Sequence, residues 1–394
     1  MSGGAVMSTE ARPFFSVVIP TKNRPALLRD AIRSVVLQEF DDVEAIVSDN
    51  CNDDRTRQTV DHFRADARLR YVRTDAELPM PDHWEFATTK ARGRYVLVLT
   101  DRSVLTPRAL ATIHRVITSS GDAAAVCSWR WALYDDTRRI LLDSAGGAPR
   151  GKAVVVDSVR VAEAFVNKSG AYPYALPRGL NSSYRDDVGR SIRDTFGRLF
   201  GPVSPDFTSA FLLLAHTPRV TYIDDPLFIS QGLSVSNGGK GIASTARPYL
   251  ETLGLRAFYE HVPIKAPIVE NVIMNDFLSV QRRAGGNLAG VALNWVEYFA
   301  ACYRELLEKE EAGLLAPPVL AGLFAEWGRA LAGFDPATRD AVRSKIARLK
   351  THMLKRVAKH SPLGPSLARL KRALGASRRF ESALGAAGFR PETP

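Results

Sequence analysis

The sequence predicts an α/β protein with an open, mostly parallel sheet, flanking helices and a C-terminal helical extension. Short apolar, β-branched runs alternate with segments whose apolar residues recur at helical spacing, a pattern typical of parallel strands joined by right-handed crossovers. Polar loops follow the first, second and fourth strand-like runs. We therefore expect these loops at the carboxyl edge of the sheet, where open α/β sheets bind ligands.

The first half of the chain shows the alternation most clearly. Residues 14–19 form a buried strand that Pro20 ends, and Pro25 suits the first turn of the helix that follows. Further strands are expected at 43–48, 69–73 and 95–100, with helices at 55–65, 81–90 and 106–118.

Beyond Gly121 the pattern is looser. Strands are expected at 123–129, 140–142, 153–156, 220–223 and 227–229, and helices at 159–168 and 207–215. Residues 234–244 are rich in Gly and Ser and form a candidate lid or linker. From about Ala246 onward the pattern is helical.

Composition and charge exclude several classes of protein. The 394 residues carry a net charge of +11, and Arg343 to Arg379 hold twelve of the 53 basic residues and no acidic one. The remainder is therefore close to neutral. No apolar run is long enough to span a bilayer, and three widely spaced cysteines suit a reducing cytoplasm rather than a disulfide framework.

Polar residues follow the first two predicted strands. Pro20, Thr21 and Asn23 come directly after the first strand, and Asp49 and Asn50 after the second. A carboxylate in this position can accept a hydrogen bond from the N–H of a nucleotide base, and we favour that role for Asp49. Pro and Asn also suit a plain strand-to-helix turn, so both interpretations of the first loop stay open.

Residues 15–56 and 95–107 together resemble the start of a family 2 glycosyltransferase with the GT-A fold. The resemblance implies an inverting enzyme that moves a sugar from a nucleotide-diphosphate sugar to a glycan or lipid-linked acceptor in surface polysaccharide synthesis. It further implies that a small set of residues holds the nucleotide: Pro20, Thr21, Asn23, Asp49, Asn50, Asp101 and Arg102.

One position departs from that family. Where its members carry an acidic triplet that binds a divalent cation, this chain has Asp101-Arg102-Ser103. Asp101 could hold Mn²⁺ or Mg²⁺, with water and phosphate completing the shell. Alternatively, the Arg102 guanidinium replaces the charge of the cation and clamps phosphate oxygens. A third interpretation is a catalytically impaired domain that binds a nucleotide sugar or glycan without turnover.

Asp206 is the candidate general base. An inverting transferase needs a carboxylate to take the proton of the attacking hydroxyl, and the similar family carries an acidic residue at a helix start in this region. An ordinary helix N-cap is the competing interpretation. The segments Asp82-His83-Trp84-Glu85 and Asn181-Ser182-Ser183 are secondary candidates.

The resemblance also suggests a division into domains. We expect a flexible tail at 1–12, a GT-A domain at 13–240 and a helical extension at 241–394. Within the GT-A domain, 13–120 would be the nucleotide-binding half and 121–240 the acceptor half.

The basic segment of the extension has an apolar helical face, with Ile346, Leu349, Met353 and Val357 among Lys and Arg side chains. Such a helix either binds an anionic membrane surface or packs on the domain with a solvated basic rim. We expect no nucleic acid, because interleaved aromatic residues are missing. The expected location is the cytoplasm, peripheral to the inner membrane face. A nucleotidyltransferase, the remaining rival, would need a Gly-rich basic loop at the start of the chain.

Overall fold

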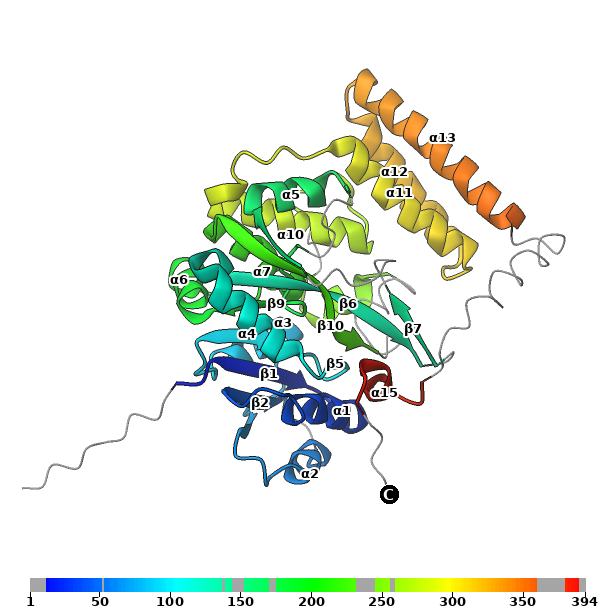
Figure 1. Cartoon of the computed structure of the whole chain (residues 1–394). Coiled ribbons are helices and arrows are strands. Elements are labelled where there is room, and N and C mark those ends of the chain that lie inside the picture. Colours follow the sequence, from blue (N-terminus) through cyan, green and yellow to red (C-terminus); the bar gives the residue numbers. More distant parts are fainter. Residues whose placement is uncertain are drawn as a thin grey trace, which may run out of the picture.

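The computed structural model describes residues 12–51, 53–136, 139–143, 152–169, 175–231, 245–255, 259–359 and 380–389. Their strands join in one sheet (Figure 1) with the order β3-β2-β1-β4-β9-β6-β10-β5, in which β7 pairs with β6 and β8 with β10. The strands are β1 Phe15–Thr21, β2 Val43–Asp49, β3 Leu69–Arg73, β4 Tyr95–Val98, β5 Ser103–Leu105, β6 Val126–Asp135, β7 Ile140–Asp143, β8 Ala153–Asp157, β9 Ser182–Arg185 and β10 Arg219–Ser230.

The principal strands run in the same direction. β1 pairs in parallel with β2 and β4, β2 with β3, and β6 with β10. β9 lies antiparallel between β4 and β6, so β6 and β10 point the same way as β1. The carboxyl ends of all these strands therefore lie along one edge of the sheet, which confirms the predicted fold class.

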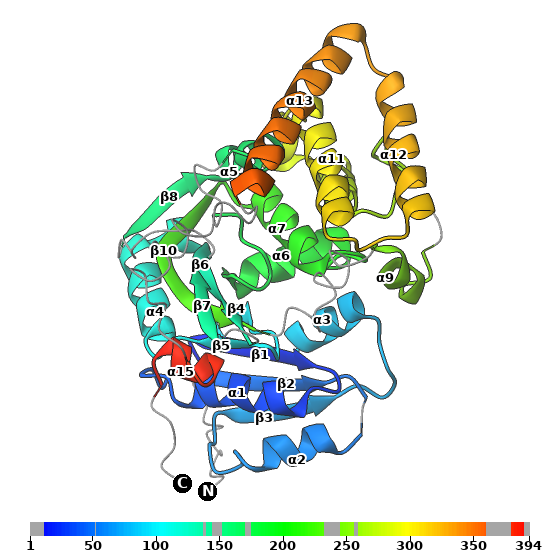
Figure 2. The same ribbon diagram turned by 90° about the vertical axis from the view of Figure 1, so that its right-hand side faces the viewer.

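Helices cover both faces of the sheet (Figure 2). In β1, Val17 and Ile19 pack with α1 and α4 on one face, whereas Val18 packs with α3, α7 and α10 on the other. This alternation follows from the two-residue period of a strand. The helices are α1 Pro25–Val36, α2 Arg55–Asp61, α3 Met80–Thr88, α4 Ala109–Ser120, α5 Ser158–Val166, α6 Asp186–Phe196, α7 Pro205–His216, α9 Arg247–Thr252, α10 Val269–Ala284, α11 Trp295–Glu311, α12 Pro317–Ala332, α13 Pro336–Lys359 and α15 Ala383–Ala387.

The C-terminal helices form the predicted extension, on the side of α5 and α10 (Figure 1). The carboxylate of Glu305 on α11 accepts hydrogen bonds of 2.9 Å from the backbone N–H groups of Val269 and Glu270, and so satisfies two free donors at the start of α10. Aromatic rings of Phe299, Trp327 and Phe334 hold α11, α12 and the turn after α12 together.

The last described residues return to the sheet. α15 packs against β5, β10 and α1 (Figure 2), where Leu384 joins an apolar cluster with Val104 and Ile229. The Tyr134 hydroxyl donates to the carbonyl of Phe380 at 2.9 Å. The sequence pattern predicts only that this stretch belongs to the helical extension, and not that it returns to the sheet.

Some predicted elements differ from the structure. The two short strands expected at 220–223 and 227–229 are one strand, β10, whose pairing continues through irregularities around Pro226. Sequence analysis did not predict β5 or α6. The candidate lid at 234–244 and most of the expected 1–12 tail lie outside the described residues.

The basic segment is described only in its first part. Val342 and Ile346 on α13 are buried, and α13 packs along α11. Lys345 pairs with Glu297 on α11. This part therefore fits the packed-appendage interpretation; the side chains of Met353 and Val357 lie outside the described ones. Among the described helices, none has the length and apolar character to cross a bilayer.

Candidate active site

Three predicted site residues gather at the carboxyl edge of the sheet. Thr21 ends β1, Asp49 ends β2 in register with it, and Asp101 follows β4. All three are buried. The Thr21 hydroxyl donates to Oδ2 of Asp101 at 3.0 Å, so the ends of β1 and β4 are joined directly.

The loop after β1 turns sharply toward α1. Asn23 has a φ of 56°, in the left-handed region that Asn tolerates better than most residues. Arg24 is the N-cap of α1, and Pro25 begins the helix. The turn interpretation of Pro20 and Asn23 therefore fits the backbone, and their contact with a nucleotide stays a prediction.

Asp101 is bound to a guanidinium group. Nη1 of Arg24 donates to Oδ1 of Asp101 at 3.1 Å, while Thr21 occupies Oδ2. Burial raises the pKa of Asp101, and the charge of Arg24 together with these hydrogen bonds opposes the shift. The Arg24 side chain is 31% exposed, so one face of this ion pair is accessible from solvent.

Asp49 is oriented by a tyrosine of the neighbouring strand. The Tyr71 hydroxyl on β3 donates to Oδ2 of Asp49 at 2.7 Å. Burial, reinforced by Asp49, raises the pKa of Tyr71 to about 12, so the hydroxyl keeps its proton and remains a donor. Arg57 on α2 lies over the same ring at 4.9 Å.

Asn50 holds the loop that follows β3. Its Nδ2 donates to the Leu78 carbonyl, and its Oδ1 accepts from the Leu78 N–H, both at 2.8 Å. This side chain therefore fixes the loop next to Asp49, and its predicted contact with a nucleotide stays untested.

Arg102 reaches the end of β10. Its Nη1 donates to Oγ of Ser230 at 2.5 Å and to the Gln231 carbonyl at 3.1 Å. Burial lowers its pKa; the charge of Asp101 opposes the shift, and so does that of Asp206. The charges of Arg24 and Arg178 add to the lowering, so four charged groups act on the Arg102 side chain.

Asp206 lies in the first turn of α7 and is not its N-cap, which is Ser204. Oδ2 of Asp206 accepts two hydrogen bonds from Arg178, at 3.0 Å from Nε and 2.5 Å from Nη2. The Arg178 guanidinium also lies 4.2 Å from the ring centroid of Phe207. These contacts fix the Asp206 carboxylate, and both hydrogen bonds from Arg178 go to the same oxygen, Oδ2.

A second carboxyl group, that of Asp276, contacts the start of α7 from α10. Asp276 of α10 is buried, and its Oδ2 accepts from the Ser204 N–H at 3.0 Å and from the Thr208 hydroxyl at 3.3 Å. Burial raises the pKa of Asp276 to about 7, against the effect of these hydrogen bonds. The helical extension therefore supports the turn that carries Asp206.

The side chains of the secondary candidates make contacts within the fold. Glu85 accepts hydrogen bonds from the Leu199 and Phe200 N–H groups, at 2.9 and 2.8 Å, and pairs with Arg193. His83 lies 2.9 Å from the Ser48 hydroxyl, and burial lowers its pKa to about 4, so it is neutral. Asn181 is buried and donates to the carbonyl of Trp129 at 3.0 Å.

The surroundings of Asp101 do not fit a divalent cation. In the described parts of the chain no three side chains of His, Cys, Asp or Glu come together. Both oxygens of Asp101 already accept hydrogen bonds, one of them from a guanidinium. Mn²⁺ and Mg²⁺ need several oxygen ligands and would be repelled by that charge. The predicted role of Asp101 as a metal ligand is therefore not favoured here.

Sequence analysis did not select Arg24, Tyr71 or Arg178. Arg24 directly follows the first polar loop, so its position in the sequence could have predicted a place at the carboxyl edge. Tyr71 lies in a predicted strand, and Arg178 in an irregular loop without periodicity. Only the folded chain brings these two side chains to Asp49 and Asp206.

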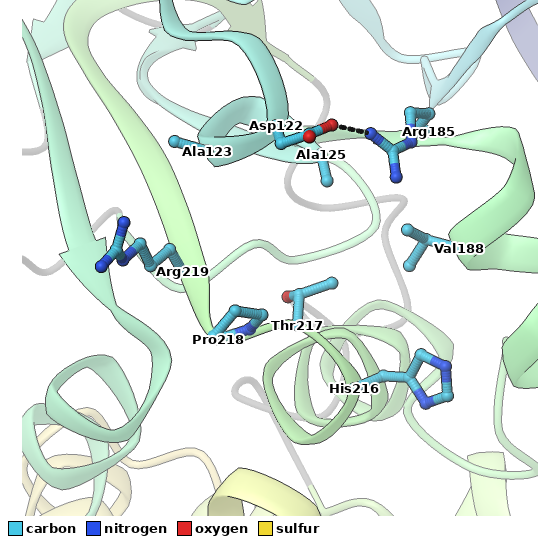
Figure 3. Close-up of a pocket in the computed structure, with 9 residues that line it drawn as sticks. All are labelled: Asp122, Ala123, Ala125, Arg185, Val188, His216, Thr217, Pro218 and Arg219. Carbon is cyan, nitrogen blue, oxygen red and sulfur yellow. Dashed lines mark hydrogen bonds and ion pairs between the residues drawn. The ribbon is translucent and has the colours of Figure 1, made fainter.

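A separate cavity of about 420 Å³ lies elsewhere (Figure 3). Asp122, Arg185, His216 and Arg219 are among its lining residues. It adjoins the amino ends of β6 and β10, which begin at Val126 and Arg219. Because Asp101 and Asp206 belong to the opposite edge, this cavity is not part of the candidate active site.

The fold and the site define an α/β protein of the GT-A class, with its polar groups at the carboxyl edge of the sheet. Residues 16–163 match the family model described as glycosyl transferase family 2. The chain thus carries a glycosyltransferase family 2 domain, which confirms the resemblance inferred from the sequence.

Two curated relatives match parts of the chain. A GalNAc(5)-diNAcBac-PP-undecaprenol beta-1,3-glucosyltransferase of Campylobacter jejuni is 35% identical over 103 residues, which are 26% of this chain and 33% of the relative. An uncharacterized protein, y4gI, of Sinorhizobium fredii is 25% identical over 253 residues, 64% of this chain and 25% of the relative. The chain thus spans about a quarter to a third of these curated relatives.

Solved structures are similar at lower identity. The S. aureus TarS 1–349 structure in complex with UDP-GlcNAc is 15% identical with a TM-score of 0.48, covering 86% of this chain and 92% of that one.

Proposed function

We propose that this protein is an inverting glycosyltransferase that moves a sugar from a nucleoside-diphosphate sugar to a hydroxyl of a glycan or lipid-linked acceptor. The observation that carries the proposal is the gathering of Thr21, Asp49 and Asp101 at the ends of three adjacent strands. The family 2 domain that contains them supports it.

In this proposal the donor nucleotide lies across the ends of β1, β2 and β4. Asp49 accepts a hydrogen bond from a base N–H, and the Tyr71 hydroxyl keeps the carboxylate in position from the other side. Asn50 supports the adjacent loop through Leu78. Pro20, Thr21 and Asn23 border the ribose and the base.

Transfer is a single displacement. The acceptor oxygen forms a bond to the anomeric carbon, the bond from that carbon to the phosphate oxygen breaks, and its electron pair leaves with the diphosphate. Asp206 takes the acceptor proton. Attack opposite the leaving group inverts the anomeric configuration. Arg178 orients Asp206 through two hydrogen bonds and leaves Oδ1 for the proton.

A lipid-linked acceptor is the form we favour. The Campylobacter jejuni relative carries undecaprenol in the name of its acceptor, and a polyprenyl carrier would place the reaction at a membrane surface. The basic residues between Arg343 and Arg379 supply charge for an anionic surface. We therefore propose a peripheral location at the inner face of the membrane, with a role in surface polysaccharide synthesis.

The test is release of nucleoside diphosphate from a panel of UDP- and GDP-sugars, with and without a membrane-lipid extract as the acceptor source. We expect one donor to be turned over by the wild type and not by Asp206→Asn. If the wild type binds a donor but never turns it over, the chain is instead a nucleotide-sugar binding domain.

A further inference from the structure

Asp101, the predicted metal ligand, is paired with a cation of the chain itself. Asp101 binds Arg24 at 3.1 Å, at the N-cap of α1 and three residues after Thr21. The N-terminus of this 12-residue helix adds a partial positive charge beside the guanidinium. The carboxylate of Asp101 therefore fixes the Arg24 guanidinium at the sheet edge, where 31% of the Arg24 side chain is exposed.

A second guanidinium, that of Arg102, makes no carboxylate contact among the described residues. The acceptors of Nη1 of Arg102 are neutral, the Ser230 hydroxyl and the Gln231 carbonyl. These bonds hold Arg102 against the end of β10 without neutralising it. Arg102 follows Asp101 in sequence, so its charge lies at the same end of β4.

A third guanidinium completes the group. Arg178 is bound to Asp206 and is 23% exposed. Its guanidinium lies 5.6 Å from the ring centroid of Trp131 on β6, which pairs with β10, the strand whose end holds Arg102. Arg24, Arg102 and Arg178 thus bring three positive charges near two carboxylates, Asp101 and Asp206. The net charge of this group is positive, so it suits an anion.

We propose that Arg24, Arg102 and Arg178 together bind the diphosphate of the donor, so that this transferase needs no divalent cation. The inference rests on the proposed function and names the groups that act in it. Sequence analysis considered Arg102 alone, whereas the structure gives Arg24 the direct contact with Asp101.

The chemistry requires stabilisation of a leaving group. When the bond from the anomeric carbon to the phosphate oxygen breaks, its electron pair becomes negative charge on the diphosphate. Guanidinium groups donate paired N–H bonds to phosphate oxygens, and their charge is fixed before the reaction begins. Asp101 then acts as a positioning residue for Arg24.

Calorimetric titrations of the full chain with UDP, GDP, UMP and GMP, each in EDTA and in Mn²⁺, test this inference. We expect one diphosphate to bind equally well in both buffers and more tightly than its monophosphate. Arg24→Gln and Arg102→Gln should each weaken the diphosphate about 10- to 100-fold and leave the monophosphate unchanged. Arg115→Gln, an equal charge change on the exposed face of α4, should alter neither.

Two results would overturn the inference. The first is diphosphate binding that requires Mn²⁺. The second is an unchanged preference for diphosphate over monophosphate in Arg24→Gln and Arg102→Gln, with melting temperatures showing that both variants are folded. Failure of every nucleotide to bind in either buffer would refute the proposed donor site itself, and the inference with it.

Discussion

Arg178 holds the carboxylate of Asp206 by two hydrogen bonds to one oxygen, Oδ2, while the next residue, Phe207, packs its ring under the same guanidinium. The carboxylate is thus oriented by a neighbour from an irregular loop rather than by its own helix. The position of the proposed base therefore depends on Arg178.

Asp206→Asn should slow transfer strongly without weakening donor binding. The amide keeps the shape of the side chain but cannot accept the acceptor proton, and loss of a general base typically costs about 10²–10⁴ in rate. Initial rates and donor titrations on the same preparation measure the two effects. Transfer at the wild-type rate would remove Asp206 from the mechanism.

Replacing Glu85 should lower the stability of the fold without changing nucleotide binding. Its carboxylate satisfies two backbone donors and Arg193 in a largely buried place. Glu85→Ala leaves those groups unpaired and should lower the free energy of unfolding by about 3–5 kcal/mol in urea titrations.

Asp82→Ala is the matched control for Glu85→Ala. Asp82 lies one turn away on α3 and pairs with Arg198 at 2.7 Å, but it is 46% exposed. Its removal should cost at most about 1 kcal/mol. Equal losses of unfolding free energy in the two variants would contradict the stabilising role assigned to the Glu85 carboxylate.

Asp276 makes the stability of the protein depend on pH. Its pKa in the folded chain is about 7, above the ordinary 3.8, so the folded state holds the proton more tightly than the unfolded state. The contribution of Asp276 is therefore fully favourable below about pH 4 and is lost as the pH rises toward 7.

Asp276→Asn removes that titration and keeps one acceptor for Ser204 and Thr208. The free energy of unfolding of the wild type minus that of the variant should fall between pH 4 and pH 7. The difference cancels titrations common to both proteins, such as that of His83. A difference that stays flat over this interval would show that Asp276 is ionised throughout.

The sequence predicted the elements whose cores are apolar and regular. β1, β2 and α1 follow directly from buried β-branched runs and from Leu28, Ile32 and Val35 at helical spacing. The position of Thr21 and Asp101 at one edge was expected because parallel strands share a carboxyl edge. The hydrogen bond between them was not predicted.

Other features depend on contacts that no local pattern encodes. α6 has a highly charged sequence whose buried face is only Val188, Gly189 and Ile192. The pairing of Arg24 with Asp101 joins residues 77 positions apart. The return of α15 to β5 depends on a short apolar patch, in which Ala383 and Leu384 are buried and Phe380 and Phe389 pack beside them.

The central claim is that a nucleoside diphosphate binds at the carboxyl edge, and Asp49 tests it most directly. The measurement is the melting temperature of the wild type and of Asp49→Ala with UDP, GDP, CDP and ADP, in EDTA and in Mn²⁺. A ligand that binds only the folded state raises the melting temperature. We predict that at least one diphosphate raises it for the wild type, and much less for Asp49→Ala. No shift with any nucleotide, or equal shifts in the two proteins, would contradict the site.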